Sequence, residues 1–386
     1  MEIFAEMPVW GQSGWEVFSR GVLIALDKIG VRVALKPKDS WNLQKCILDD
    51  EDLSRLNRMC STRVHPSSMQ ITHQFPSWEY VNSDGFKATN FHVCYSIFET
   101  SLCPTTWSPT LSKMEEVWVL SEFNRIGWEK SGLKNVNVSP VGIDSELFNP
   151  SAEPIRVKNA KGFKFITNGD FTERKGFELL IEAFVKEFSG DDDVCLIFKS
   201  HYGGFTRAHK IALLETIKRM VRYWKKQNPP KVLLFGEKLP SHVMPSFYTG
   251  GDCFVLPTKG EGLGIPYMEA LACEIPVIAT NWGAQLQLLD QDNAYLVKCN
   301  TRVVDDISYI KKCPDALNHE WAICDIDHLR QTMRFVYEFR DEAKKKAMQG
   351  RSDMEKLTWQ NVALWIVKQM IDMPSRISGR KAEVTD

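Results

Sequence analysis

The sequence predicts an α/β protein built from two doubly wound domains in tandem. Its 386 residues exceed the roughly 250–300 residues at which a single hydrophobic core stops growing. Short apolar strands alternate with amphipathic helices from residue 2 onward, and a second such series starts at residue 163. Between the two series, residues 150–160 are polar and carry Pro150 and Pro154, which indicates a domain boundary. This alternation is typical of parallel sheets covered by helices on both faces.

In the first domain, the opening forty residues predict a β-α-β unit. Residues 2–8 form its first strand, and apolar residues recur at helical spacing from Phe18 to Ile29. Gly30 ends that helix, and residues 31–35 form the next strand. Ser121 is expected to cap a later helix, because its side chain can accept a hydrogen bond from the first turn. Further strands are expected at 69–73, 91–98, 117–120 and 136–140.

The second domain repeats the pattern. A helix over 177–188 carries Leu180 and Phe184 on one face, and residues 360–373 form a terminal amphipathic helix. Strands are expected at 163–167, 194–198, 231–235, 252–256 and 276–279. We therefore divide the chain into a first domain, 1–155, a second domain, 156–358, and a terminal helix with a frayed tail, 359–386.

Composition excludes several classes of protein. The chain carries 48 Lys and Arg against 49 Asp and Glu, so a protein that coats nucleic acid is disfavoured, and no nucleic-acid partner is expected. Hydrophobic residues make up 44%, which excludes disorder as the main state. None of the ten cysteines forms a Cys-x-x-Cys pair, so no zinc site is expected and the cysteines are read as reduced and structural. No signal peptide and no run of ~20 apolar residues is visible. We expect a cytoplasmic protein, with peripheral membrane contact still open.

The most informative segment follows the predicted strand 252–256. Its loop holds Gly260, Gly262 and Gly264, and Pro266 suits the first position of a helix. Glycines let backbone amides approach an anion, and a helix N-terminus adds partial positive charge. The segment therefore predicts a phosphate cradle, although such turns also occur simply as tight corners.

Charged residues accompany this cradle. Glu261 lies inside the loop and Glu269 in the following helix, where carboxylates can accept hydrogen bonds from sugar hydroxyls. A solvated loop carboxylate and a dipole-stabilised helix carboxylate are the structural alternatives. After the strand at 163–167, Arg174 and Lys175 precede another helix and can face an anionic ligand. Basic loop residues are more often merely exposed, so each signal alone stays ambiguous.

Together these motifs resemble the retaining glycosyltransferases of family 4. The family's Glu-x7-Glu hallmark corresponds to Glu261 through Glu269, and Lys175-Gly176 also matches. Other segments that resemble the family are 118–124, 140–144, 270–272 and 276–283. The resemblance implies the GT-B architecture, in which two Rossmann-like doubly wound domains face each other across a cleft. The first domain would serve the acceptor and the second the nucleotide sugar. The terminal helix would pack back on the first domain.

The resemblance also implies roles for single residues. Lys175 would bind the donor diphosphate, Glu269 the ribose hydroxyls, and Glu261 the transferred sugar. Glu99 stands where many members have a histidine beside the reacting sugar. Asp170 stands where many have a second diphosphate-binding arginine, and Arg174 would serve in its place. The remaining donor-binding residues implied are Gly14, Glu237, Leu239, Gly262, Leu263, Gly264 and Ile265. Glu261, Glu99 and Lys175 are the catalytic candidates.

The function implied is transfer of a hexose-type sugar from a UDP- or GDP-sugar to a glycan, glycoconjugate or lipid-linked acceptor. Retention by a front-face mechanism, without a cofactor or metal, is implied likewise. A catalytically silent sugar-nucleotide or glycan-binding protein on the same fold stays open, as does a GT-B epimerase or phosphorylase. A nicotinamide-dependent dehydrogenase is disfavoured, because the first loop offers only Gly11 and Gly14 where Gly-x-Gly-x-x-Gly is needed.

Overall fold

The computed structural model describes residues 1–38, 46–65, 68–73, 89, 91–202, 204–225 and 227–383. The chain forms two compact units. The first contains Met1–Phe98, Leu102–Ile143 and Leu357–Asp386, and the second contains Glu99–Ser101 and Asp144–Lys356. The chain therefore enters the second unit after Ile143 and returns to the first at Leu357.

The first unit is built on a six-stranded parallel sheet with the order β2-β1-β3-β4-β5-β6. Ile3 of β1 pairs with Val33 of β2 on one side and with Met69 of β3 on the other, so the strand order reverses at β1. The strands are β1 (Glu2–Pro8), β2 (Arg32–Lys38), β3 (Met69–His73), β4 (Phe91–Tyr95), β5 (Glu116–Val119) and β6 (Val136–Val138). All six lie in regions where apolar runs predicted strands, although β4 ends at Tyr95 rather than at residue 98.

Capping residues set where the helices of the first unit begin. Ser13 and Glu16 form a capping box at the start of α1 (Gly14–Lys28). At α6 (Glu122–Lys130) the side chain of Ser121 accepts a hydrogen bond from the backbone amide of Asn124 at 3.2 Å, as the sequence predicted. The other helical segments of this unit are α2 (Asp50–Ser61), η1 (Thr105–Trp107), α5 (Ser108–Leu111) and α14 (Trp359–Glu383).

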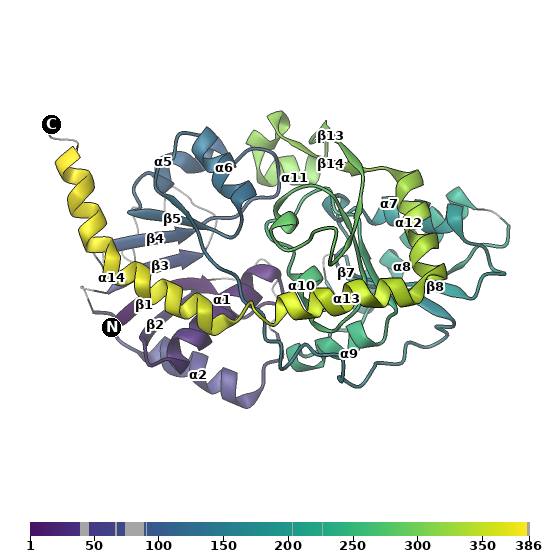
Figure 1. Cartoon of the computed structure of the whole chain (residues 1–386), viewed down its shortest axis with the longest axis horizontal. Helices are drawn as coiled ribbons and strands as arrows, with labels where there is room; N and C mark the ends of the chain where they lie inside the picture. The colour runs from purple at the N-terminus through teal and green to yellow at the C-terminus, as the bar shows by residue number, and fades with distance from the viewer. Residues whose placement is uncertain are drawn as a thin grey trace. The chain divides into compact units, whose positions relative to one another are not determined.

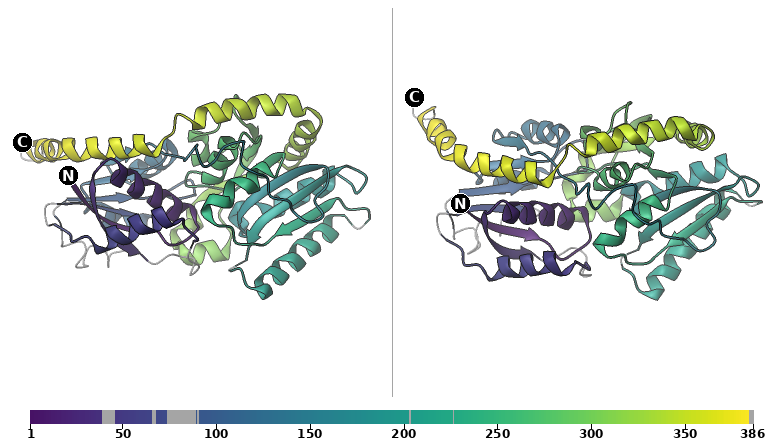
Figure 2. Two further views of the ribbon diagram at one scale, coloured as in Figure 1. Left: turned by 90° about the horizontal axis from the view of Figure 1, so that it is seen from below. Right: turned by 60° about the horizontal axis from the view of Figure 1, so that its bottom comes forward.

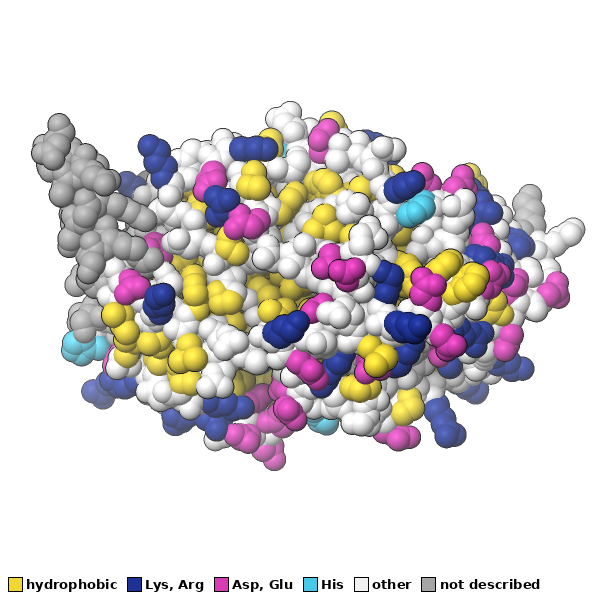
Figure 3. All heavy atoms as spheres, viewed as in Figure 1, with side chains coloured by type: hydrophobic (Ala, Val, Ile, Leu, Met, Phe, Trp, Pro, Cys, Tyr) yellow, Lys and Arg dark blue, Asp and Glu magenta, His cyan; other side chains and the backbone are white. Residues whose placement is uncertain are grey.

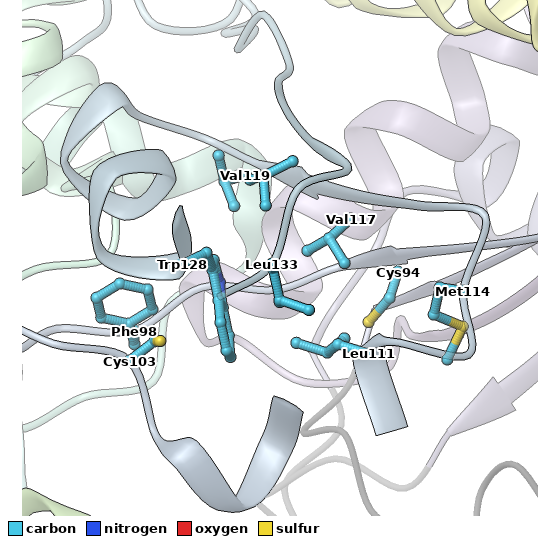
Figure 4. Packing of buried hydrophobic residues seen from close by; sticks show 10 residues of the cluster. Cys94, Phe98, Cys103, Leu111, Met114, Val117, Val119, Trp128 and Leu133 are labelled. Atoms are coloured by element: carbon cyan, nitrogen blue, oxygen red, sulfur yellow. The ribbon is translucent and has the colours of Figure 1, made fainter. Parts of the chain in front are cut away.

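A buried cluster joins β4 and β5 to α6 (Figure 4). The rings of Phe98 and Trp128 meet edge to face, with centroids 5.6 Å apart. Gly127 makes this contact possible, because a Cβ at that position would touch the Phe98 ring. Asn124 donates a hydrogen bond to the carbonyl oxygen of Phe98 at 3.0 Å. The segment just before Glu99 is therefore fixed by both packing and hydrogen bonding.

The terminal helix α14 packs against α1 (Figures 1 and 2). The Trp359 ring lies against Gly21 of α1 and Gly142, where neither residue has a side chain to exclude it. Trp365, one turn and a half further on, meets the ring of Trp118 at a centroid distance of 4.8 Å. Aromatic packing thus attaches the last described helix to the first unit.

The second unit contains another six-stranded parallel sheet, with the order β12-β11-β10-β7-β8-β9. Its strands are β7 (Phe163–Asp170), β8 (Val194–His201), β9 (Lys231–Phe235), β10 (Cys253–Leu256), β11 (Val277–Thr280) and β12 (Tyr295–Val297). Five of these confirm predicted strands, and β12 was not predicted. An antiparallel pair, β13 (Cys299–Val303) and β14 (Glu320–Cys324), was not predicted either.

Helices of the second unit cover this sheet. The helix α10 (Ile265–Ala272) is almost wholly buried, and α13 (Arg340–Met354) runs beside it, with Gly350 against Leu271 (Figure 1). The other α-helices are α7 (Phe177–Glu187), α8 (Arg207–Trp224), α9 (Met244–Thr249), α11 (Ile307–Lys312) and α12 (Ile326–Glu338). Short 3-10 turns lie at η2 (Glu173–Lys175), η3 (Ser241–Val243), η4 (Ala284–Gln287) and η5 (Pro314–Asn318).

Acidic and basic side chains are interspersed on the face shown in Figure 3, as the balanced composition predicts. Within the residues that the structure describes, none of the helices has the length and hydropathy needed to cross a membrane.

Candidate functional site

The second sheet reverses its strand order between β7 and β10. From β7 the chain continues to β8 and β9 on one side, whereas β10 and β11 lie on the other. In open parallel sheets such a reversal leaves a crevice at the carboxyl ends of the two central strands, where ligands bind. The loops that follow β7 and β10 are the two segments in which the sequence predicted ligand-binding residues.

Backbone hydrogen bonds join these two loops. The amide of Lys259 donates to the carbonyl oxygen of Arg174 at 2.7 Å, and the Arg174 guanidinium donates to the carbonyl oxygen of Gly260 at 2.5 Å. Gly176 has a φ of +68°, and a Cβ there would overlap the carbonyl oxygen of Pro257. Glycine is therefore required at this position both for its backbone conformation and for the close approach of the loops.

Lys175 and Glu261 form a buried ion pair, with Nζ and Oε1 2.6 Å apart. Thr258 donates its hydroxyl to the same oxygen at 3.1 Å. Burial alone would raise the pKa of Glu261, but the charges of Lys175 and Arg174 outweigh it and hold that pKa below its ordinary value. Glu261 is therefore an ionised acceptor of hydrogen bonds.

Arg174 lies between two carboxylates of the second unit. Its guanidinium is 3.4 Å from Glu261 and 3.7 Å from Glu99, and Tyr309 donates its hydroxyl to Glu99 at 3.0 Å. Burial would lower the pKa of Arg174, but Glu99 and Glu261 together raise it above its ordinary value. Arg174 is thus a permanent cation beside Lys175. Asp170 is the last residue of β7, and its carboxylate accepts a hydrogen bond from the His201 ring at 2.7 Å.

Glu269 lies in the first turns of α10 and is buried. Tyr248 of α9 donates its hydroxyl to Oε2 of Glu269 at 2.5 Å, and Asn168 donates to the Tyr248 oxygen at 3.3 Å. Burial raises the pKa of Glu269 to about 7, although the Tyr248 hydrogen bond and the charge of Lys199 oppose the rise. Burial also lowers the pKa of Lys199 to about 8. This carboxyl group therefore changes its charge near neutral pH.

The raised pKa of Glu269 predicts a cost in stability. The unfolded chain releases this proton near pH 4.5 and the folded chain near pH 7, so the free energy of unfolding falls across that window and stays lower above it. Glu269→Gln removes the ionisation. We expect it to raise the free energy of unfolding at pH 8 by about 3 kcal/mol, with little gain at pH 5. Urea denaturation at both pH values measures this, and the exposed Glu215→Gln is the control. A gain that is equal at pH 5 and pH 8 would contradict the account.

The loop after β10 ends at Gly264, the N-cap of α10, with a φ of +99°. Gly262 and Leu263 are buried in this loop, and Ile265 is the first residue of the helix. In the first turn of α10, Pro266 has no amide hydrogen and the amide of Tyr267 donates to the carbonyl oxygen of Gly264 at 2.9 Å, which leaves the amide of Ile265 for an anion. This geometry fits the predicted phosphate cradle.

Three further residues were predicted to bind the donor. Glu237 is an exposed ion-pair partner of Lys210, and Leu239 is buried in the segment after β9. Gly14 belongs to the first unit, where it is the exposed first residue of α1. The loop before it is held by Arg20, which donates to the carbonyl oxygens of Val9 and Gly11, both at 2.7 Å.

Sequence reasoning missed several residues that hold the site. Tyr248, Lys199, Thr258 and Tyr309 each touch or face one of the predicted residues, yet they lie 3 to 210 positions away along the chain. Only Thr258 carried a signal, because it stands within the glycine-containing loop. Among the residues that the structure describes, no group of three or more His, Cys, Asp and Glu residues could hold a metal ion.

One family match lies within the second unit. Residues 150–322 match the family described as "Glycosyl transferases group 1". The lipopolysaccharide core biosynthesis mannosyltransferase LpsB of Rhizobium meliloti (strain 1021) is 29% identical over 153 residues, 38% of this chain and 41% of the relative. A GDP-mannose-dependent alpha-(1-6)-phosphatidylinositol monomannoside mannosyltransferase of Mycolicibacterium smegmatis (strain ATCC 700084 / mc(2)155) is also 29% identical, over 164 residues, 39% of this chain and 40% of the relative. The chain thus matches about two fifths of the length of these relatives.

Two solved structures match nearly the whole chain. Anabaena Alr3699/HepE in complex with UDP and glucose has a TM-score of 0.66 at 12% identity, covering 96% of this chain and 100% of that chain. Sucrose-phosphate synthase from Thermosynechococcus elongatus has a TM-score of 0.65 at 16% identity, and the match covers 97% of this chain and 99% of that chain. These likenesses confirm the predicted α/β fold class of GT-B type. The match over residues 150–322 and the two mannosyltransferases relate the chain to the group 1 glycosyltransferases.

Proposed function

We propose that the protein is a retaining glycosyltransferase of the family 4 type. It would move a hexose-type sugar from a UDP- or GDP-sugar to a glycan, glycoconjugate or lipid-linked acceptor. The observation that carries the proposal is the buried group of Lys175, Arg174 and Glu261 at the strand-order reversal, beside the N-terminus of α10. The relatives support it, since two are named mannosyltransferases, one of them GDP-mannose-dependent, and one structure contains UDP and glucose.

The donor diphosphate would bind between Lys175 and the start of α10. A lysine ammonium has three donors, and the structure gives one of them to Glu261. Among the described residues no other acceptor takes the remaining two, which would serve phosphate oxygens together with the amides of Leu263, Gly264 and Ile265. Arg174 adds a second positive charge close by. Binding of an anion would then compete with the Lys175–Glu261 pair and release Glu261 for the sugar.

The two glutamates would divide the rest of the donor between them. Glu261 is ionised and would accept hydrogen bonds from hydroxyls of the transferred sugar. Glu269 lies in the second turn of α10 and would accept from the ribose hydroxyls. Glu237 and Leu239 would contact the base, and Gly14 would admit the first-unit loop to the diphosphate. The first unit would bind the acceptor.

In the transfer, the bond between the anomeric carbon and the diphosphate oxygen breaks, and a bond from the acceptor oxygen forms on the same face. The acceptor proton passes to the leaving phosphate, so atoms and charge balance. Negative charge grows on the diphosphate as the bond breaks. Lys175, Arg174 and the preorganised amides would stabilise it, without need of a metal ion or cofactor.

Glu99 would act mainly through Arg174. Its carboxylate is held by the Tyr309 hydroxyl and faces the Arg174 guanidinium. A carboxylate with two such partners is a weaker nucleophile, because the lone pairs of its oxygens are already engaged. We therefore place Glu99 at the reacting sugar as a group that orients Arg174, rather than as the attacking atom.

Turnover of donor tests this function. The protein is incubated with UDP- and GDP-hexoses, and release of the nucleoside diphosphate and the anomeric configuration of the sugar product are followed by NMR. We expect turnover of one donor with retention, lowered about 100-fold in Glu261→Gln. Nucleotide binding without any turnover would identify the silent binding protein, and an inverted product would contradict the retaining mechanism.

A further inference from the structure

We propose that Tyr248 is a positioning residue that fixes the Glu269 carboxylate, so that one oxygen is kept for the ribose hydroxyls of the donor nucleotide. This inference rests on the proposed function of Glu269. Tyr248 donates to Oε2 at 2.5 Å, and both side chains are buried. Among the described residues, none donates a hydrogen bond to the other oxygen, Oε1. The carboxylate is therefore oriented at one atom and open at the other.

The Tyr248 hydroxyl is itself held in one direction. It has a single proton, which goes to Glu269, while Asn168 at the end of β7 donates to its oxygen at 3.3 Å. The ring packs against Phe254 of β10 and Phe148, at centroid distances of 5.7 Å and 6.2 Å. A chain of hydrogen bonds thus runs from β7, through α9, to α10. It links the carboxylate to the strand whose following loop carries Lys175.

The hydrogen bond from Tyr248 can be measured through the pKa of Glu269, which also depends on burial and on neighbouring charges. Lys199 of β8 acts electrostatically on Glu269, and Asp170 acts on Lys199. Cys273, the residue after α10, interacts with both Glu269 and Arg351 of α13. Lys199 and the Tyr248 hydroxyl favour the ionised carboxylate, whereas burial favours the neutral form. Without the Tyr248 hydroxyl, less interaction opposes the effect of burial, so the pKa of Glu269 rises further. The carboxyl group then keeps its proton to a higher pH, and a protonated group accepts hydrogen bonds from ribose less well.

The test compares two tyrosines. Tyr248→Phe removes the donor to Glu269. Tyr267→Phe is the matched control, because Tyr267 is equally buried and donates to the carbonyl oxygen of Leu256 at 2.6 Å. The dissociation constants of UDP and GDP are measured by calorimetry from pH 6 to pH 9. The values of kcat and KM are measured with the nucleotide sugar that the protein uses as donor.

For Tyr248→Phe we expect the pH at which nucleotide binding is half lost to rise by about one unit, because a hydrogen bond to a charged group is worth about a tenfold change. The ionised fraction of Glu269 at pH 7 then falls from about a half to about a tenth, so binding near pH 7 weakens about fivefold and KM rises with it, while kcat changes less than KM. Tyr267→Phe leaves the pH midpoint unchanged. Equal pH profiles in the two variants would overturn the proposal, since a merely structural role of Tyr248 would give that result.

A second readout does not depend on nucleotide. With carboxyl-labelled glutamate, the resonance absent from Glu269→Gln is titrated by NMR in wild type and Tyr248→Phe. We expect its pKa to be higher in Tyr248→Phe, and an unchanged pKa overturns the proposed role of Tyr248. Failure of wild type to bind any nucleoside diphosphate would instead overturn the proposed function and the ribose-binding role of Glu269. The two failures are therefore distinguishable.

Discussion

Lys175→Met is expected to lower donor turnover by about 100- to 1,000-fold, the cost of removing one preorganised group from a developing anion. Lys175 Nζ is 2.6 Å from Glu261 at the strand-order reversal, and it is the cation that the proposal places on the leaving diphosphate. Its loss leaves growing negative charge beside Glu261, which then keeps Arg174 as its charged partner. Single-turnover kinetics at saturating donor measure the effect on the chemical step.

Lys259→Met is the matched control for that variant. Lys259 is 3% exposed at its side chain and pairs with Glu173 at 2.9 Å and Glu178 at 2.8 Å. Removing either lysine takes from a buried carboxylate its nearest cation, which costs stability, at most about 3–5 kcal/mol, the typical value for breaking a fully buried pair. Only Lys175→Met should also abolish most of the turnover. Equal losses of turnover in both folded variants would show that the charge of Lys175 has no special role.

Gly176→Ala is expected to destabilise the second unit by about 2–5 kcal/mol, the sum of backbone strain and overpacking. The φ of Gly176 is +68°, and an added methyl group would overlap the carbonyl oxygen of Pro257. Because that contact joins the loops after β7 and β10, relief of the overlap must separate them. The melting temperature should fall by about 2–4 °C for each kcal/mol, and donor binding should weaken at temperatures where the variant is folded.

Gly132→Ala is the control that separates backbone strain from steric overlap. Gly132 also has a positive φ, +89°, but no atom lies within 4 Å of a Cβ built there. It therefore carries the backbone strain without the overlap, and we expect about 1 kcal/mol and unchanged donor binding. If both variants lost the same stability and neither altered binding, close approach of the two loops would not be what Gly176 provides.

Much of the site could be predicted because its parts are local motifs joined by a simple topology. The strands before Lys175 and Glu261 are short apolar runs, and each ends in a loop marked by glycine. Adjacent parallel strands bring their carboxyl ends together, so residues 86 positions apart along the chain form one ion pair. Glu269 follows from the helical continuation of the second motif.

The remaining contacts depend on packing that no local pattern encodes. Tyr248 stands in a helix of six residues, and its hydroxyl reaches Glu269 only because α9 packs on α10. Tyr309 reaches Glu99 across 210 positions. Arg174 was predicted to face the diphosphate, but its guanidinium also bonds the Gly260 carbonyl and two carboxylates. The sequence shows which residue types are present, but not how many partners each one shares.

Nucleoside diphosphate binding tests the central claim most directly. Calorimetric titration of the intact protein with UDP, GDP, ADP, TDP and CMP, repeated with Glu269→Ala and Lys175→Ala, shows whether the second unit holds a nucleotide site. The account predicts one site that prefers UDP or GDP and is lost in both variants while they remain folded. Absence of binding at millimolar concentrations of every nucleotide, or binding that both variants retain, would contradict it.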